Sequence, residues 1–338
     1  MIDLLVAGGG PAGLATAIHA ARAGLEVVVA EPRPGPVDKA CGEGLMPAAV
    51  AALSGIGVAV GGRPLRGIRY VDARHAAEAH FRAGPGRGVR RTELHAALAR
   101  RAAELGVPVL PLKIDAVRQG ADGVAAAGLT ARYLAAADGL HSPIRRALGL
   151  SGPPGPAPAR YGLRRHFAVP PWSDCVEVHW SARAEAYVTP VGPDLVGVAL
   201  LTCDRAPFDE HLAAFPALTA RLPPTAATAV RGAGPLRQPV RARVAGRVLL
   251  VGDAAGYVDA LTGEGVSLAV RGAAELVRCV RAGRPEAYER AWSAMSRRHR
   301  ALTTLLLRAR GCPGTAARIV PAAARFPALF AAVVNRLA

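Results

Sequence analysis

The chain has 338 residues, of which 51% are hydrophobic and 20% charged, a composition that excludes disorder and suits two domains or one two-lobed unit. The formal net charge is +17, but all of the 42 basic residues except Lys39 and Lys113 are arginines spread along the chain. Because aromatic residues do not interleave with them, we expect a solvated surface and no nucleic-acid partner, with attraction to anionic cofactors or membranes as the second interpretation. Five scattered cysteines without a C-x-x-C pair, and nine histidines without ligand spacing, predict a reducing, cytoplasmic location without disulfides or a metal.

The first thirty residues predict one βαβ unit. Ile2–Ala7 is a short apolar run, typical of a buried parallel strand and not of a signal peptide. After a glycine turn, Leu14–Ala23 is alanine-rich and predicted to be helical, and Gly24 ends it. The valine-rich segment Glu26–Ala30 is predicted to be the second strand.

The remaining chain alternates between helical parts and a middle of successive strands, some of them alternating in polarity, which favours an antiparallel sheet. The predicted elements are a helix at Arg91–Leu105, strands at Val107–Leu110, Ile114–Arg118 and Tyr133–Ala137, a helix at Pro143–Leu148, strands at Leu163–Val169, Cys175–Trp180, Glu185–Thr189, Leu195–Leu201 and Arg247–Val251, and helices at Gly265–Arg281, Glu286–Arg310 and Pro313–Ala338. The Gly/Pro run Ser151–Pro158 is predicted to be a loop, and no apolar run is long enough to span a bilayer.

A glycine motif fills the turn between the first strand and the first helix: Gly8-Gly9-Gly10-Pro11-Ala12-Gly13. In G-x-G-x-x-G, Gly8 permits the tight turn, Gly10 lets the backbone approach a pyrophosphate, and Gly13 allows close packing of helix and strand. The second strand ends on Glu31, whose carboxylate is placed to accept the ribose hydroxyls of an adenosine. A carboxylate at this position argues against a 2′-phosphate in the pocket. Arg33, two residues further on, leaves the alternative open because an arginine can bind a phosphate.

A second motif near residue 250 distinguishes FAD from NAD. The predicted buried strand Arg247–Val251 delivers Asp253, whose carboxylate can hold the ribityl or ribose hydroxyls of a flavin nucleotide. The segment Thr262-Gly263-Glu264-Gly265 then starts the predicted helix Gly265–Arg281, with Val266 as a further candidate contact, and the positive end of the helix dipole would stabilise reduced flavin.

Together these motifs resemble the FAD-dependent aromatic hydroxylases of the p-hydroxybenzoate hydroxylase type and the geranylgeranyl reductases, which share one fold. Ala137-Asp138-Gly139, followed by Ser142 and Arg145, completes the resemblance over most of the chain. It implies an α/β fold with a Rossmann-like, glutathione-reductase-type FAD-binding domain, an antiparallel β-sheet substrate lobe and C-terminal helices. We expect residues 1–158 to begin the FAD domain, 159–240 to form the substrate lobe, and 241–338 to complete the FAD domain and add the helices.

The resemblance also implies further FAD contacts. Asp138 is linked to flavin and pyridine-nucleotide use, Arg91 at a helix start resembles a flavin contact, and Val117 corresponds to a position beside the adenine. The segment Asp38-Lys39-Ala40-Cys41-Gly42-Glu43-Gly44-Leu45 resembles a loop of the geranylgeranyl reductases in which Cys41, Gly42 and Gly44 lie along the flavin. Cys41 and Glu43 are the flavin-adjacent candidates for catalysis; a chemical role for the Cys41 thiol is the less favoured interpretation.

One departure favours the hydroxylases. Reductases of this branch carry an aromatic Y-x-W-x-F-P segment, whereas this chain has Ala186-Tyr187-Val188-Thr189-Pro190. Tyr187 and Trp180 are candidates for the substrate pocket, with simple core packing as an equal alternative.

We therefore expect an FAD-dependent, NADPH- or NADH-consuming monooxygenase that hydroxylates or epoxidises a small apolar, aromatic or polyketide-type metabolite through a flavin C4a-hydroperoxide. The alternatives are a geranylgeranyl-reductase-like enzyme that reduces prenyl double bonds, and a non-catalytic flavin-binding redox partner. For the arginine-studded C-terminal helices we favour docking over the FAD domain; peripheral membrane contact is the alternative.

Overall fold

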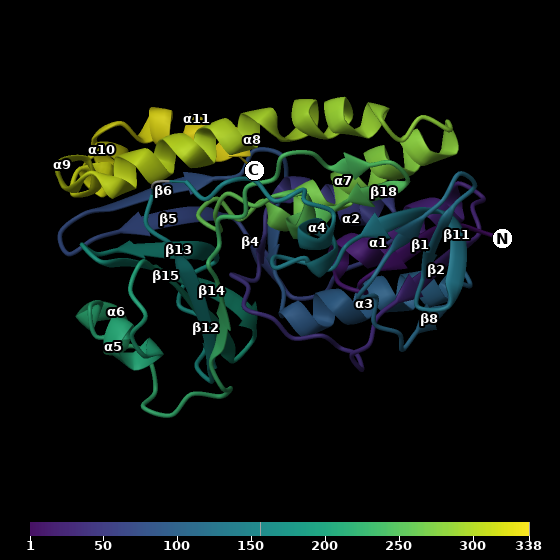
Figure 1. Cartoon of the computed structure of the whole chain (residues 1–338). Helices are drawn as coiled ribbons and strands as arrows, with labels where there is room; N and C mark the ends of the chain where they lie inside the picture. Colours follow the sequence, from purple (N-terminus) through teal and green to yellow (C-terminus); the bar gives the residue numbers. More distant parts are fainter. Residues whose placement is uncertain (156, 338) are drawn as a thin grey trace.

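The computed structural model describes residues 1–155 and 157–337, and it contains two lobes that lie side by side (Figure 1). The predicted loop Ser151–Pro158 and the predicted helical tail each include one residue outside this description, residues 156 and 338. The other residues of that loop contain no helix and no strand longer than one bridge.

The first lobe is built on a parallel sheet with strand order β18-β11-β1-β2-β8, extended by short antiparallel strands. Its strands are β1 (Ile2–Ala7), β2 (Val27–Ala30), β8 (Val109–Leu110), β9 (Arg118–Gln119), β10 (Val124–Ala126), β11 (Leu129–Ala136), β17 (Val244–Ala245) and β18 (Val248–Leu250). The central β1 is fully paired on both edges, which explains its continuous apolar sequence. The helices around this sheet are α1 (Pro11–Arg22), α2 (Pro47–Gly55), α3 (Arg91–Glu104), α4 (Pro143–Ala147) and α7 (Gly265–Arg281), and a 3₁₀ turn follows β18 at Gly252–Ala255.

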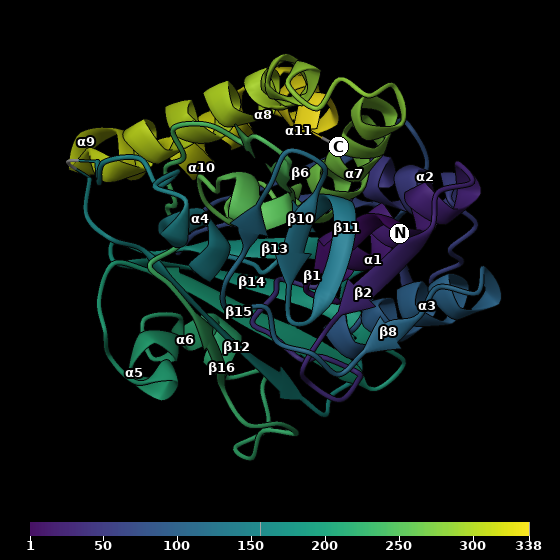
Figure 2. The ribbon, with the colours of Figure 1, turned by 45° about the vertical axis from the view of Figure 1, so that its right-hand side comes forward.

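The second lobe is a seven-stranded sheet with order β16-β12-β15-β14-β13-β5-β6 (Figure 2). Its strands are β5 (Gly67–Val71), β6 (Ala76–His80), β12 (Tyr161–Phe167), β13 (Cys175–Trp180), β14 (Ala184–Gly192), β15 (Leu195–Thr202) and β16 (Arg231–Ala233). All neighbours are antiparallel except β13 and β5. Two short helices, α5 (Phe208–Leu212) and α6 (Pro216–Thr219), belong to this lobe, and a small sheet of β3 (Gly44–Leu45), β4 (Arg63–Leu65) and β7 (Gly86–Gly88) connects the lobes.

The C-terminal helices form a layer along one side of the molecule in both views. They are α8 (Ala287–Gly311), α9 (Pro313–Ala316), α10 (Ile319–Arg325) and α11 (Pro327–Leu337). Among the described residues no single helix is long and apolar enough to cross a membrane. One pair, Gly314–Arg325 with Pro327–Leu337, qualifies by length and composition only, and it is bent by 105°.

The predicted fold class is confirmed: an α/β chain with a Rossmann-like FAD-type domain, a mainly antiparallel second sheet and C-terminal helices. The domain boundaries at residues 158 and 240 stay a prediction, and β5 and β6 show that the second sheet also uses chain from before residue 158. The predicted strand Ile114–Arg118 is wrong over most of its length, because only Arg118 and Gln119 pair with a neighbour. Ile114 is buried between the exposed Lys113 and Asp115, so the segment alternates like a strand without having a hydrogen-bonded partner.

Docking of the tail over the FAD domain is also wrong. Helices α10 and α11 pack on β5 and β6, at the edge of the second sheet. The helices pack on the second sheet because the small side chains of Ala77 and Ala79 on β6 leave room for apolar side chains of the helices. These are Ala323, Phe330 and Val334, and all five residues are buried.

Candidate active site

One cavity of about 1030 Å³ lies between the lobes and receives side chains from both sheets and from the tail. Its polar end is lined by residues from the two nucleotide-type motifs, from the loop after β2, from the start of α3 and from the segment after β11, namely Gly10, Ala12, Arg33, Lys39, Arg91, Asp138 and Asp253. Its apolar end is lined by β5, β13, β14 and β15 and by α10 and α11. The size is at the upper end of ordinary ligand pockets, so the space is large enough for a cofactor and part of a substrate.

Helix α1 points its N-terminus into the polar end. Gly10 is its N-cap without a side-chain cap, and Pro11 occupies the first turn. A Cβ on Gly13 would lie 1.8 Å from the carbonyl oxygen of Gly8, whereas a Cβ on Gly10 would meet no protein atom within 4 Å. Gly13 therefore permits the tight turn itself, while Gly10 leaves the helix end open to an anionic group.

Glu31 lies directly behind this turn. Its Oε2 accepts a hydrogen bond of 2.8 Å from the amide of Gly9, and Arg33 donates to both carboxylate oxygens at 2.7 and 2.8 Å. Burial alone would raise the pKa of the Glu31 carboxyl, but these donors outweigh burial and leave the pKa below its ordinary value. The carboxylate is thus ionised and oriented, with Arg33 placed between it and the cavity.

The Asp138 motif organises the cavity wall opposite. Asp138 Oδ2 accepts a hydrogen bond of 3.1 Å from the amide of Ile144, and the Ser142 hydroxyl caps α4 by accepting from the amide of Arg145 at 2.9 Å. The buried Arg145 guanidinium donates to the carbonyl oxygens of Leu140 and Ala254. Arg145 therefore ties this motif to the Asp253 segment without entering the cavity.

Three cations and two carboxylates face the polar end: Arg33, Lys39, Arg91, Asp138 and Asp253. Burial raises the pKa of Asp253, although Lys39 and Arg91 pull it in the opposite direction, and burial lowers the pKa of Lys39. Within the described residues, Arg91 Nη1 and Asp138 Oδ1 are buried without any hydrogen-bond partner. Buried polar atoms are rarely left unpaired, so these two fit a polar ligand that fills this end.

Helix α7 brings a second N-terminus to the same cavity. Gly263, Gly265 and Val266 line it, and no acidic residue occupies the first turn of α7. The Glu264 carboxylate turns away to His299 of α8, at 2.9 Å. The two uncapped helix ends and the excess of cations suit the charge and the ring carbonyl of a flavin dinucleotide.

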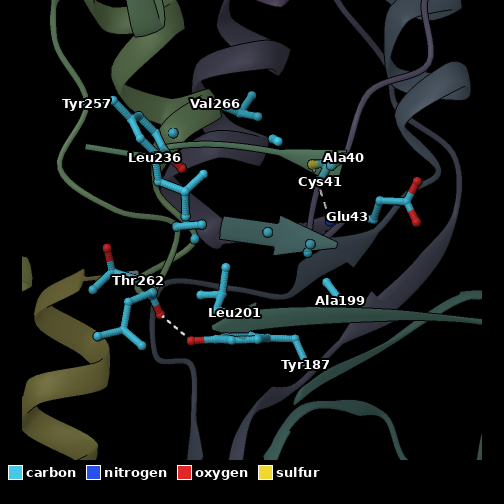
Figure 3. A pocket seen from close by; sticks show the side chains of 18 of the residues that line it. Ala40, Cys41, Glu43, Tyr187, Ala199, Leu201, Leu236, Tyr257, Thr262 and Val266 are labelled. Carbon is cyan, nitrogen blue, oxygen red and sulfur yellow. Dashed lines mark hydrogen bonds between the residues drawn. The ribbon is translucent and has the colours of Figure 1, made fainter. Parts of the chain in front are cut away.

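The loop Cys41–Leu45 crosses the cavity between these helix ends (Figure 3). The Cys41 thiol accepts from the amide of Glu43 at 3.3 Å, and burial raises the pKa of this thiol, which favours the neutral form. A Cβ on Gly42 would meet no protein atom within 4 Å, whereas one on Gly44 would lie 3.1 Å from Val176. The loop can therefore lie against a flat ring on one side.

Glu43 has a φ of 59°, in the left-handed region, and its carboxylate points away from the centre of the cavity (Figure 3). Oε1 accepts from the amide of Arg91 at 2.8 Å and Oε2 lies 2.6 Å from Nε2 of His166. Arg164 and Thr228 surround the other ring nitrogen of His166. Glu43 thus holds the loop to both lobes.

The apolar end begins at Tyr187, whose hydroxyl donates to the carbonyl oxygen of Leu261 at 3.0 Å (Figure 3). Burial raises the pKa of this phenol well above its ordinary value. From the tail, the lining residues are all apolar: Leu306, Ile319, Ala322, Ala323, Phe326, Leu329, Phe330, Val333, Val334 and Leu337.

The structure brings most of the predicted site residues to this cavity, but not all of them. Gly8, Gly13 and Glu31 support the turn from behind. Val117 packs against the core of the first lobe, and Trp180 packs behind Tyr70, with ring centroids 5.2 Å apart; neither is among the lining residues. Lys39 was not predicted as a site residue, although its motif contains it. The tail was expected to dock over the FAD domain or, alternatively, to contact a membrane, and its contribution to the cavity wall was not predicted.

Comparison with known proteins agrees with this geometry. A family model described as an FAD binding domain matches residues 1–193. Menaquinone reductase of Mycobacterium tuberculosis (strain ATCC 25618 / H37Rv) is 36% identical over 167 residues, 44% of this chain and 40% of that protein. Dialkyldecalin synthase of Streptomyces rugosporus is 29% identical over 301 residues, 81% of this chain and 64% of that protein. The matched segments therefore span less than two thirds of these relatives.

Solved structures share the fold at low identity. The flavin-dependent brominase Bmp2 superposes with a TM-score of 0.83 at 18% identity, over 99% of this chain and 93% of that one. The Diels-Alderase PyrE3 gives a TM-score of 0.74 at 23% identity, over 100% and 77%. The chain belongs to the FAD-binding family of aromatic hydroxylase type. It is a flavoprotein of the FAD-dependent oxidoreductase group, and the expected FAD cofactor is supported.

Proposed function

We propose that this protein reduces an isolated double bond in a long apolar, isoprenoid-type chain, with FAD as its cofactor and NADPH or NADH as the reductant. The observation that carries the proposal is the continuous cavity that joins the polar, nucleotide-type end to an apolar end lined by the tail. A small aromatic substrate has no need of so long an apolar wall, whereas a lipid chain does.

FAD would be held by the α1 and α7 N-termini, Arg91, Asp138 and Asp253, with Cys41, Gly42 and Gly44 along the ring. Reduced FAD supplies a hydride when it is bound. The residues of the chain orient the substrate and exclude water: Tyr187 is fixed by Leu261, and Val178, Leu201 and Phe330 offer only apolar surface. The neutral Cys41 thiol is placed beside the ring without acting as a nucleophile.

The relatives give independent support. The relative from Mycobacterium tuberculosis is a menaquinone reductase, and its 36% identity to this chain is limited to 167 residues. This favours a quinone or a prenylated quinone as the first substrate class to test. The segment Ala186–Pro190 lacks the aromatic residues of the prenyl reductases. In this protein, apolar side chains of the tail line the cavity instead, so the missing aromatic residues do not argue against a prenyl substrate.

A monooxygenase is the second candidate, and the departure at Ala186–Pro190 favours it. In that case the same cavity would hold an apolar aromatic or polyketide-type molecule. The cavity would also suit a redox-neutral ring closure, the activity that the name dialkyldecalin synthase suggests, or a flavin-binding redox partner without catalysis.

The test is product analysis by mass spectrometry. The purified holoprotein is incubated with NADPH or NADH and a detergent-dispersed prenylated quinone, once under nitrogen and once under ¹⁸O₂, with Gly10→Ala as the matched control. We expect a product that gains two hydrogens under nitrogen and carries no ¹⁸O, and fragment ions should place both hydrogens in the prenyl chain and not in the quinone ring, where reduction to the quinol gives the same change in mass. Incorporation of ¹⁸O would establish the monooxygenase instead, an isomer of unchanged mass a cyclase, and reduced FAD without any product a redox partner.

A further inference from the structure

We propose that the tip of the α10–α11 hairpin rests on an anionic membrane surface and that lipid substrate enters the cavity there. The second clause rests on the proposed function, whereas the docking itself does not. The tip is defined here as residues 325–329, where α10 ends at Arg325 and α11 begins at Pro327.

The tip combines exposure with access to the cavity. Phe326 is 57% and Leu329 64% exposed, and both also line the cavity. They are thus the rim at which the cavity meets the outside. Among the described residues only six large hydrophobic side chains are exposed, and three of them, Leu305, Phe326 and Leu329, lie in the C-terminal helical layer. At the tip, Phe326 and Leu329 are three positions apart, and two exposed apolar side chains at the mouth of an apolar cavity mark an interaction surface.

The charged side chains of the chain after Glu289 are of one sign. After Glu289 the sequence contains no Asp or Glu, and its basic residues are Arg290, Arg297, Arg298, Arg300, Arg308, Arg310, Arg318, Arg325 and Arg336. Arg318, Arg325 and Arg336 are exposed, and no carboxylate in residues 1–155 or 157–337 pairs with any of them. Unpaired arginines that flank an apolar rim complement anionic lipid headgroups, because the charge stays at the headgroups while the apolar side chains enter below them.

The inner faces of α10 and α11 pack against the second lobe. The Phe330 ring packs against the Tyr70 ring in a tilted arrangement, with centroids 4.8 Å apart, and Val320 is buried. The Asn335 side chain donates to the carbonyl oxygen of His80 at 2.9 Å and accepts from the amide of Arg82 at 2.7 Å. Only the tip and the outer face are therefore free, so the hairpin lies on the membrane and does not span it.

The alternative occupant is an acidic protein partner. The structure favours the membrane because the exposed apolar side chains form the rim of a cavity whose lining continues inward as apolar residues. A protein that covered Phe326 and Leu329 would close this rim, whereas a bilayer would extend the apolar surface on both sides of it.

The experiment is co-sedimentation of the FAD-loaded protein with vesicles of phosphatidylcholine alone and of phosphatidylcholine with phosphatidylglycerol. We expect binding only to the anionic vesicles, weakened by added salt. The double variant Phe326→Ser, Leu329→Ser and the double variant Arg318→Gln, Arg325→Gln should each bind at least about tenfold more weakly. Val109→Ser is the matched control, since Val109 is 47% exposed on β8, far from the tip (Figure 1). FAD content and the circular dichroism spectrum verify that each variant is folded.

Absence of binding to anionic vesicles, or equal binding by the Phe326/Leu329 variant and by the wild type, would overturn the docking proposal. The reductase assay uses detergent-dispersed substrate, so its failure would leave the vesicle result untouched. Failure of docking alone would likewise leave the proposed reaction standing.

Discussion

The carboxylate of Glu43 and the imidazole of His166 are joined by a hydrogen bond of 2.6 Å, and both side chains are only 1% exposed. Glu43 belongs to the loop that crosses the cavity, and His166 belongs to β12 of the second lobe. A carboxylate only accepts, so the His166 Nε2 carries the proton, and Nδ1 is free to accept from Arg164 at 3.2 Å. This pair fixes the loop and the second lobe to one another.

We expect His166→Ala to lower the free energy of unfolding by about 3 kcal/mol, because it leaves a buried carboxylate short of a partner. The control is His80→Ala. It removes an equally short contact to Glu78, but here the side chains of His80 and Glu78 are 54% and 42% exposed. That change should cost less than about 1 kcal/mol. Urea unfolding of the apoproteins measures both; equal costs would show that burial of the Glu43–His166 pair is not what stabilises the loop.

Gly10→Ala should weaken FAD binding at least about tenfold without destabilising the apoprotein. The added methyl group meets no protein atom, and the backbone at Gly10 has a φ of −72°, which alanine adopts freely, so only an approaching ligand is obstructed. Gly55→Ala, equally free of contacts, serves as the control. Isothermal titration with FAD and thermal unfolding separate the two effects. Unchanged affinity would place the pyrophosphate elsewhere.

Glu31 should contribute to the acid stability of the protein. Its pKa is lowered below the ordinary value of 4.5, so its stabilisation is complete above that value and is lost as the pH falls through the folded pKa. We expect unfolding free energies of wild type and Glu31→Gln to converge as the pH is lowered through this window and to differ at neutral pH. Because Arg33 is half exposed, the effect is moderate. Glu104→Gln, at an exposed ion pair, is the control, and a parallel pH dependence of Glu31→Gln and wild type would contradict the assignment.

Asn335→Ala should loosen the tail. The side chain makes two hydrogen bonds to the end of β6, and its loss should cost about 1 kcal/mol for each. Hydrogen exchange followed by mass spectrometry should show faster exchange in α11 and unchanged exchange in α1. Equal protection of α11 in both proteins would mean that apolar packing alone holds it.

The sequence predicted what depends on local pattern. Strand β1, α7 and β13 were predicted at their observed bounds, because a buried apolar run, a glycine start or alternation marks each of them. The parallel pairing of β13 with β5 has no such signal, since Cys175 lies opposite Gly67 across more than a hundred residues. β6, with the sequence AAEAH, carries little strand propensity, so the surface on which α10 and α11 dock could not be predicted.

In the site, too, local motifs were predictable from the sequence, whereas contacts between distant segments were not. The motifs identified Gly10, Asp138 and Asp253 as candidate site residues, and all three line the cavity. The contact of Glu43 with His166 joins residues 123 positions apart, and only the packed structure brings them together. Trp180 lies at the end of β13, where it packs against Tyr70, while Val176 and Val178 of the same strand line the cavity.

The most direct test of the proposed reaction is anaerobic stopped-flow reoxidation of the dithionite-reduced holoprotein by detergent-dispersed prenyl lipids of increasing chain length. We predict return of the oxidised flavin spectrum without oxygen, faster as the chain lengthens to fill the apolar end of the cavity. A flavin that stays reduced with every lipid, and is reoxidised only when oxygen is admitted, would contradict the account.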